Sequence, residues 1–326
     1  MTPPDVLAWL LDSDPAIRWQ VLQDLTDAPP SAVATEREHV ATDGLGAAVL
    51  ALQGADGRWG GAAWNRGWTS TMHALLLLRE FGLDPASAEA RRAVTLVRER
   101  VTWAGCAPPE CHAHSFFEGE VEPCINGQVA QAGAYFGQDV SRIVDRLLTE
   151  QLPDGGWNCD AENGSTRSSF NTTICVLEGL LEHERCIASR ADVGAARRRG
   201  DEYLLERHLF YRRSTGAAIA YDRKMGAASA SGAPAFTRLA FPAWWHYDVL
   251  RGLDYLRRAG ARPDARMQAA IDVVAAKQGA DGRWCLDVQY AGPMLVAVDE
   301  GEGLPNRWLT LRALRVLHWF LGAKNG

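Results

Sequence analysis

A seven-residue motif, Gln-x-x-Asp-Gly-x-Trp, occurs three times in this chain, at residues 53–59, 151–157 and 278–284. Self-similarity over such long intervals is typical of repeat folds. Asp-Gly favours a tight turn because glycine accepts positive φ. The glutamine can bond loop backbone, and the tryptophan can cover the apolar end of a helical hairpin. The motif therefore predicts a repeated structural corner that holds the fold and does not react.

Each copy of the motif lies between two helical patterns, an amphipathic one before it and a more apolar one after it. The expected helices before the motif are 45–52, 140–148 and 267–277, and those after it are 68–81, 168–182 and 306–321. The motif tryptophans are 98 and then 127 residues apart, each about twice the length of a hairpin. Two further pairs without the motif fill the gaps, at 86–101 with 124–136 and at 197–209 with 241–258.

These segments predict five hairpins within 41–321, preceded by an N-terminal helical segment, 1–40, with short helices around 6–11 and 15–25. A hairpin in such a repeat buries its apolar face only against the next hairpin. We therefore expect a single domain over 1–326, although length alone would suggest about two domains.

The repeats, with the continuation Gly156-Trp157 and then Ser168-Ser-Phe-Asn-Thr-Thr-Ile-Cys-Val-Leu-Glu-Gly-Leu180, resemble squalene/oxidosqualene cyclases and the β-subunits of protein prenyltransferases. The resemblance covers roughly residues 41–321. It implies an all-α fold, an α/α toroid of five to six hairpins in which inner helices ring an apolar cavity and outer helices wrap them. It also implies an isoprenoid-like ligand.

All loops that lead from an outer to an inner helix lie on one rim of such a toroid. Those loops carry Cys106, Cys111, His112, His114, Cys124, Cys159 and Asp160. Cysteine and histidine at this local spacing favour a tetrahedral zinc site. The predicted zinc ligands are Cys106, Cys111, His114 and Cys124, with His112 as a substitute for His114. The alternative is a long loop of reduced cysteines and surface histidines.

The resemblance does not carry over the zinc site of the prenyltransferases. That site uses Asp-x-Cys at the start of one inner helix and a histidine on the next inner helix. Aligned on the helix glycines, these positions hold Cys124, Asn126 and Thr172 in this chain, so only one of them keeps a good ligand.

The acidic signatures of terpenoid cyclases are also missing. The sequence contains no Asp-Asp pair, so neither Asp-x-Asp-Asp nor Asp-Asp-x-x-Asp is present. Asp160, just after a motif tryptophan, and Glu122, in the Cys/His loop, are the candidate catalytic carboxyl groups. A turn or N-cap role is the alternative for Asp160.

Arginines precede or open four of the five inner helices. Their guanidinium groups and the helix N-termini beside them would both attract an anionic head group. These are Arg66, Arg167, Arg238 and Arg307. Aromatic residues near the same helix starts could line an apolar pocket; they are Trp68, Trp244, Trp245, His246 and Trp308. Pairing with loop carboxylates and packing between hairpins are the alternatives.

Composition narrows the classes of function. Lysine and arginine number 34 against 40 acidic residues, and a net charge of −6 argues against a nucleic-acid partner. Apolar runs such as residues 74–78 are far too short for a transmembrane helix, and early aspartates argue against a signal peptide. We therefore expect a cytoplasmic protein whose seven cysteines form no disulfide framework.

The sequence favours an enzyme of the cyclase or prenyltransferase type that acts on or binds a small apolar, isoprenoid-like ligand, with zinc as its candidate cofactor. Two alternatives stay open. One is a ligand-binding or scaffold toroid without chemistry, and the other is a carbohydrate-active α/α barrel with paired carboxylates.

Overall fold

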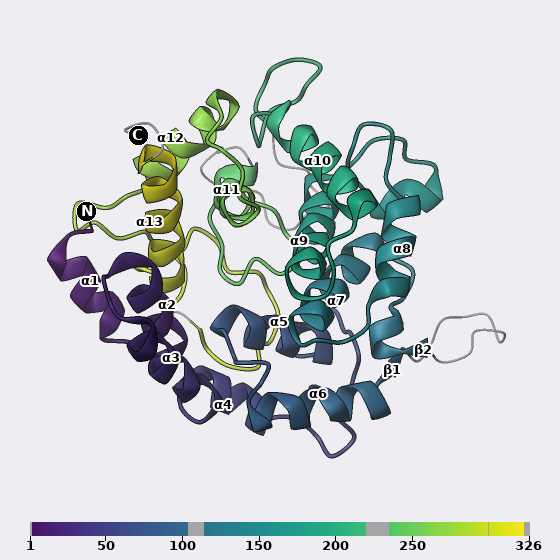
Figure 1. The fold of residues 1–326 in the computed structure, drawn as a ribbon. Helices are drawn as coiled ribbons and strands as arrows, with labels where there is room; N and C mark the ends of the chain where they lie inside the picture. Colours follow the sequence, from purple (N-terminus) through teal and green to yellow (C-terminus); the bar gives the residue numbers. More distant parts are fainter. Residues whose placement is uncertain (1, 104–113, 220–234, 299, 323–326) are drawn as a thin grey trace. The chain divides into compact units, whose positions relative to one another are not determined.

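The computed structural model describes residues 2–103, 114–219, 235–298 and 300–322 (Figure 1). Within these residues the extended secondary structure is one short hairpin, β1 (Thr102–Trp103) with β2 (His114–Ser115), and the other elements are helical. The predicted all-α class is confirmed. None of the described helices combines the length and apolar character that a membrane span requires.

The chain divides into two compact units. The first unit comprises Met1–Leu10, Gly200–Tyr290 and Asp299–Gly326, and the second comprises Leu11–Arg199 and Ala291–Val298. The first unit contains one copy of the motif, and the second contains two. The single domain over 1–326 stays a prediction.

The α-helices are α1 (Pro4–Leu11), α2 (Pro15–Leu25), α3 (Pro30–Glu38), α4 (Gly44–Ala51), α5 (Thr71–Phe81), α6 (Ala88–Arg100), α7 (Pro123–Tyr135), α8 (Ser141–Thr149), α9 (Phe170–Cys186), α10 (Ala191–Leu205), α11 (Val249–Arg258), α12 (Gln268–Ala276) and α13 (Arg307–Gly322). Short 3-10 helices are η1 (His39–Ala41), η2 (Phe116–Glu118), η3 (Cys159–Asn163), η5 (Ala235–Thr237) and η6 (Ala265–Met267).

Burial separates inner from outer helices, as the repeat predicts. All of α5 except Glu80 is buried, and so is α9 from its first residue to His183. In contrast, α6 and α8 bury one face and expose the other. The fold class is thus confirmed at the level of its helices and hairpins.

The three motifs make the same contacts. The indole N–H donates to a carbonyl of the preceding outer helix, namely Val49, Leu147 or Val274, at 2.6, 2.7 and 2.7 Å. The tryptophan backbone N–H donates to a threonine hydroxyl of the following inner helix, namely Thr71, Thr173 or Thr310, at 3.3, 3.0 and 3.0 Å. The glutamine amide donates to the carbonyl of the motif glycine, Gly57, Gly155 or Gly282. Each motif therefore ties an outer helix to the inner helix that follows it.

Two glycines let α7 and α9 pack side by side in the second unit (Figure 1). A Cβ atom on Gly127 would lie 2.5 Å from the Cys175 carbonyl oxygen, and one on Gly179 would lie 2.3 Å from the Gly127 carbonyl oxygen. The backbones of these two inner helices therefore approach too closely for any side chain.

The helix expected over 241–258 begins only at Val249, so this prediction is wrong at its start. Pro242 has no N–H to donate, and Trp244 has a φ of 52°, outside the helical region. Asp248 caps the helix by accepting a hydrogen bond from the Arg251 N–H at 2.9 Å. The expectation that Trp244, Trp245 and His246 lie on a helix is therefore also wrong.

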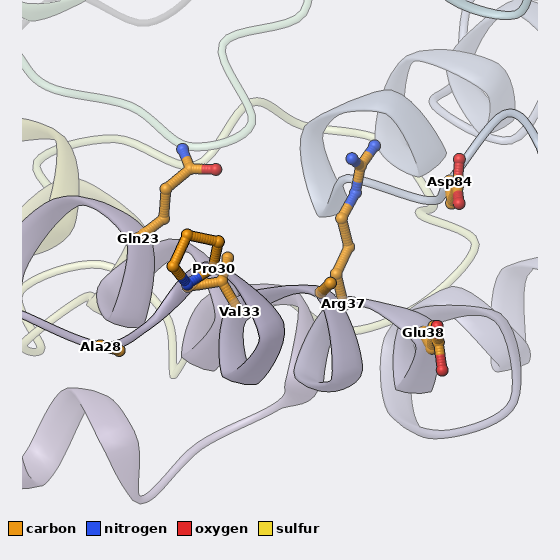
Figure 2. A pocket seen from close by; sticks show the side chains of 8 residues that line it. Gln23, Ala28, Pro30, Val33, Arg37, Glu38 and Asp84 are labelled. Carbon is orange, nitrogen blue, oxygen red and sulfur yellow. The ribbon is translucent and has the colours of Figure 1, made fainter.

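A surface pocket of about 380 Å³ lies beside α2 and α3 of the second unit (Figure 2). The Arg37 guanidinium enters it but is engaged, since it donates to the Gly82 carbonyl at 2.8 Å and to the Tyr135 hydroxyl at 3.0 Å. The sequence pointed to none of its lining residues, which are Gln23, Ala28, Pro30, Val33, Ala34, Arg37, Glu38 and Asp84.

Candidate functional site

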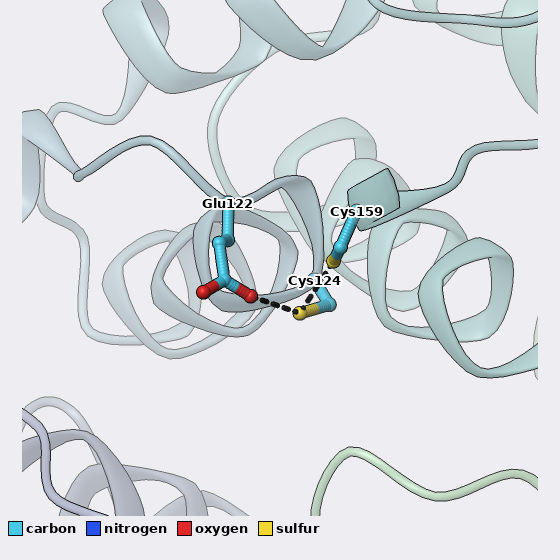
Figure 3. Close-up of side chains that lie close together, drawn as sticks. All are labelled: Glu122, Cys124 and Cys159. Atoms are coloured by element: carbon cyan, nitrogen blue, oxygen red, sulfur yellow. Dashed lines mark hydrogen bonds between the residues drawn. The ribbon is translucent and has the colours of Figure 1, made fainter. Parts of the chain in front are cut away.

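Two cysteines and a glutamate come together at the start of α7 in the second unit (Figure 3). The Sγ atoms of Cys124 and Cys159 are 2.9 Å apart, and Cys124 Sγ is 3.7 Å from Glu122 Oε2. One ligand atom from each of the three residues lies within 4.8 Å of the other two. Both cysteines are half-buried and Glu122 is exposed, so the cluster is open to solvent on the glutamate side.

Local sequence explains how each cysteine reaches this point. Pro123 occupies the first position of α7, which needs no N–H donor, and it places Cys124 in the first helical turn. Asn158 caps η3 by accepting from the Asp160 N–H, and this turn directs Cys159 toward α7.

Inner helix α9 supports the cluster from a third side. Its Thr172 hydroxyl lies 3.5 Å from Cys159 Sγ, as donor, and 3.4 Å from the Cys159 N–H, as acceptor. Three segments distant in sequence thus fix the two sulfur atoms.

The two thiols titrate as a pair. The hydrogen bond shared with Cys124 lowers the pKa of Cys159 below its usual value, although burial opposes this. The same contact, with burial, raises the pKa of Cys124 far above its usual value, because a second thiolate would place two negative charges 2.9 Å apart. A bound cation would remove this penalty by neutralising both sulfurs.

The donor set can be compared with what zinc requires. Zn–S and Zn–O bonds of about 2.3 and 2.1 Å in a tetrahedron place sulfur and oxygen about 3.6 Å apart and two sulfurs about 3.8 Å apart. The Glu122–Cys124 distance of 3.7 Å matches the first value. The Cys124–Cys159 distance of 2.9 Å is shorter than the second, so the sulfurs would separate by about 0.9 Å around the ion. The residues therefore fit zinc after a small side-chain movement.

The structure describes two of the four predicted zinc ligands, His114 and Cys124. Cys106 and Cys111, like the substitute His112, lie outside the described residues. His114 lies in β2, where its Nδ1 is 3.8 Å from a Glu118 carboxylate oxygen. Of the two predicted ligands that the structure describes, Cys124 lies in the cluster, where its partner is Cys159, and His114 does not. The sequence placed Cys159 on the correct rim, but no local spacing marks it as a ligand.

The two candidate catalytic carboxyl groups flank the cysteines. Glu122 belongs to the cluster, whereas Asp160 follows Cys159 in η3 with an exposed side chain. Asp160 therefore does not sit in a dry environment of the kind that prepares a carboxyl group for general-acid catalysis.

The candidate binding residues of the second unit are Arg66, Trp68 and Arg167. Arg66 and Arg167 are exposed. Trp68 is buried against the 291–298 segment, to which its indole N–H donates at the Ala291 carbonyl and its backbone N–H at the Pro293 carbonyl. This tryptophan holds a loop in place.

The candidate binding residues of the first unit contact other protein groups. Arg238 donates to the Asp287 carbonyl at 2.9 Å, and the Arg307 guanidinium lies 4.6 Å from the Trp9 ring centroid. Trp308 stacks on Phe241 at 4.5 Å.

A second aromatic stack in the first unit consists of Trp245, His246 and Tyr290, with centroid distances of 3.7 and 3.4 Å. Trp244, which precedes Trp245 in the sequence, is also buried, with 6% of its surface exposed. These contacts agree with the packing alternative for the aromatic residues.

Comparisons with known proteins give only distant matches. No protein-family model matches the chain, and no curated protein matches it in sequence. A solved structure of a protein from Actinoplanes is 17% identical, with a TM-score of 0.44 over 95% of this chain and 90% of that one. The type II terpene cyclase MstE from Scytonema is 16% identical, with a TM-score of 0.43 over 99% and 91%. A variant of MstE in complex with geranylgeranyl dihydroxybenzoate is 16% identical, with a TM-score of 0.42 over 98% and 87%.

Proposed function

We propose that this protein is a metal-dependent enzyme of the cyclase or prenyltransferase type, with zinc held by Cys124, Cys159 and Glu122. The observation that carries the proposal is the convergence of two sulfurs and a carboxylate within 4.8 Å. Thiolate and carboxylate are preferred zinc ligands, and three protein ligands leave a fourth position for substrate or water, as in catalytic zinc sites.

The protein groups around the site have defined tasks in this proposal. Cys124 and Cys159 bind as thiolates, and Thr172 orients Cys159 through its hydroxyl. Glu122 supplies the exposed ligand, on the side from which a substrate would enter. Bound zinc would act as a Lewis acid toward a nucleophile or an anionic head group.

The isoprenoid-like substrate is the part of the proposal that rests on sequence resemblance. An apolar chain with an anionic head group suits a metal centre at the start of an inner helix, where the helix N-terminus also favours negative charge. A prenyl diphosphate combines both properties and is the probe of choice.

Metal analysis of the purified protein tests the centre. Wild-type protein should retain about one zinc per chain, as a three-ligand site implies. Cys124→Ser and Cys159→Ser should lose it, and Glu122→Gln should bind it more weakly. Cys285→Ser is the matched control, because Cys285 is an exposed cysteine outside the cluster. Zinc-free wild-type protein with unchanged stability in chelator would refute the metal centre.

Geranylgeranyl diphosphate binding, measured by calorimetry with and without chelator, tests the substrate class. We expect binding to weaken when the metal is removed and to weaken equally in Cys159→Ser. Binding without turnover of any prenyl substrate would favour the non-catalytic alternative. Absence of binding in the zinc-loaded protein would refute the isoprenoid assignment.

A further inference from the structure

The same two cysteines are positioned for a second chemistry. A disulfide has an S–S bond of about 2.05 Å. From 2.9 Å the sulfurs of Cys124 and Cys159 need to approach by only about 0.9 Å, comparable to the separation that zinc would require in the opposite direction. Small side-chain movements thus lead from this arrangement to two different chemical states.

The surroundings permit that movement. Cys124 lies in the first turn of α7 and Cys159 at the first residue of η3, so neither sulfur is enclosed within a helix interior. Both side chains are half-buried, which leaves access for a small reagent. Among the other cysteines with described positions, Cys175 is buried in α9, and Cys186 and Cys285 are exposed and lie outside the cluster.

We propose that Cys124 and Cys159 form a reversible disulfide by exchange with a small disulfide such as oxidised glutathione, and that this state excludes the metal. The thiolate of one cysteine attacks the glutathione disulfide, forming a mixed disulfide and releasing one glutathione thiolate. The second cysteine then attacks the protein sulfur of the mixed disulfide and releases the second glutathione. The two cysteine protons end on the two glutathione molecules, so the pair loses two electrons and oxidised glutathione gains them.

The exclusion of metal follows from the ligands and rests on the proposed function. A disulfide sulfur is not a thiolate and cannot serve as a zinc ligand. Oxidation leaves Glu122 as the only remaining donor of the cluster, so the site loses zinc. Conversely, bound zinc holds the sulfurs apart and protects them from oxidation.

The experiment uses the full-length protein in metal-free and zinc-loaded forms. Each form is incubated in glutathione buffers of increasing oxidation, then alkylated and analysed by peptide mapping and metal content. We expect a Cys124–Cys159 linked peptide in the metal-free protein, reversal by dithiothreitol, and protection by zinc. In Cys124→Ser and in Cys159→Ser the remaining cysteine should stop at the mixed disulfide with glutathione. Cys285→Ser should behave as wild type.

The outcomes separate the two proposals. If both cysteines remain singly alkylated or glutathionylated in buffers that oxidise Cys285, the disulfide proposal is refuted, whatever the metal content. If the linked peptide forms but wild-type protein never binds zinc, the metal centre fails and the disulfide stands. If zinc stays bound in the linked protein, the mutual exclusion is wrong.

Discussion

Thr173 fixes a motif tryptophan through a single buried hydroxyl. The Trp157 N–H donates to Thr173 Oγ1 at 3.0 Å, and both residues are fully buried. Thr173→Val keeps the shape of the side chain but leaves the N–H without this acceptor, so we expect a loss of about 1–3 kcal/mol in the free energy of unfolding measured in urea. The matched control, Thr149→Val at an exposed site, should cost less than about 0.5 kcal/mol. Equal losses at the two sites would contradict this role.

Asp248 gives the first unit a pH-dependent contribution to stability. Burial raises the pKa of this carboxyl to about 6, while hydrogen bonds from the Arg251 and Ala240 N–H groups oppose the rise. Because the folded pKa exceeds the unfolded one, the contribution is present at low pH and is lost as the pH rises through 6. Relative to Asp248→Asn, wild-type protein should therefore gain roughly 1 kcal/mol between pH 7 and pH 5. A constant difference between the two proteins would show that Asp248 does not titrate there.

At the scale of single residues, contacts between neighbouring segments can be predicted from the sequence. Contacts between side chains from two segments far apart in the sequence cannot. Each motif tryptophan joins the outer and the inner helix of a single hairpin, so three copies suffice to infer this contact. Cys124 and Cys159 are 35 residues apart and belong to two different hairpins. Cys106 and Cys111 were predicted as partners of Cys124 because they are close to it in sequence, and they stay a prediction because they lie outside the described residues.

At the scale of whole elements, the packing of α7 against α9 depends on glycine. A Cβ atom on Gly127 would meet the Cys175 backbone at 2.5 Å, so Gly127→Ala must push the two inner helices apart. We expect it to lower the free energy of unfolding by about 1–3 kcal/mol, although alanine is the better helix former by about 1 kcal/mol. In Gly194→Ala of α10, the new methyl group meets only the ends of the Glu184 and Arg198 side chains, and stability should stay level or rise. The same sign for both variants would contradict the close-packing argument.

Hydrophobic periodicity finds an element only where one face is buried. It predicted the apolar inner helices closely, as with 306–321 against the observed α13 (Arg307–Gly322). It missed α3, which buries none of its residues and therefore carries no apolar stripe. It also extended the helix before Val249 backward, because residues 241–248 are mostly buried. Their backbone is not helical: Pro242 lacks an N–H, and Trp244 has a positive φ.

Both units bury a histidine that must remain neutral. Burial lowers the pKa of His73 in the second unit and of His246 in the first unit to about 3. In the unfolded chain these groups take up a proton below about 6.5, so the unfolded state binds more protons in acid. The two histidines should therefore lower the stability of the protein as the pH falls from 6.5 toward 3, opposite in sign to the contribution of Asp248.

The size of this acid effect can be divided between the two units. Between pH 7.5 and pH 5.5 each histidine should cost about 1.4 kcal/mol of unfolding free energy, the free energy of protonating one imidazole in the unfolded state alone. His73→Gln and His246→Gln should each reduce the pH dependence by that amount, and the double variant should reduce it by the sum, because the two residues lie in different units. Urea unfolding curves at the two pH values measure the pH dependence of the unfolding free energy. An unaltered dependence in the double variant would mean that other groups cause the loss of stability in acid.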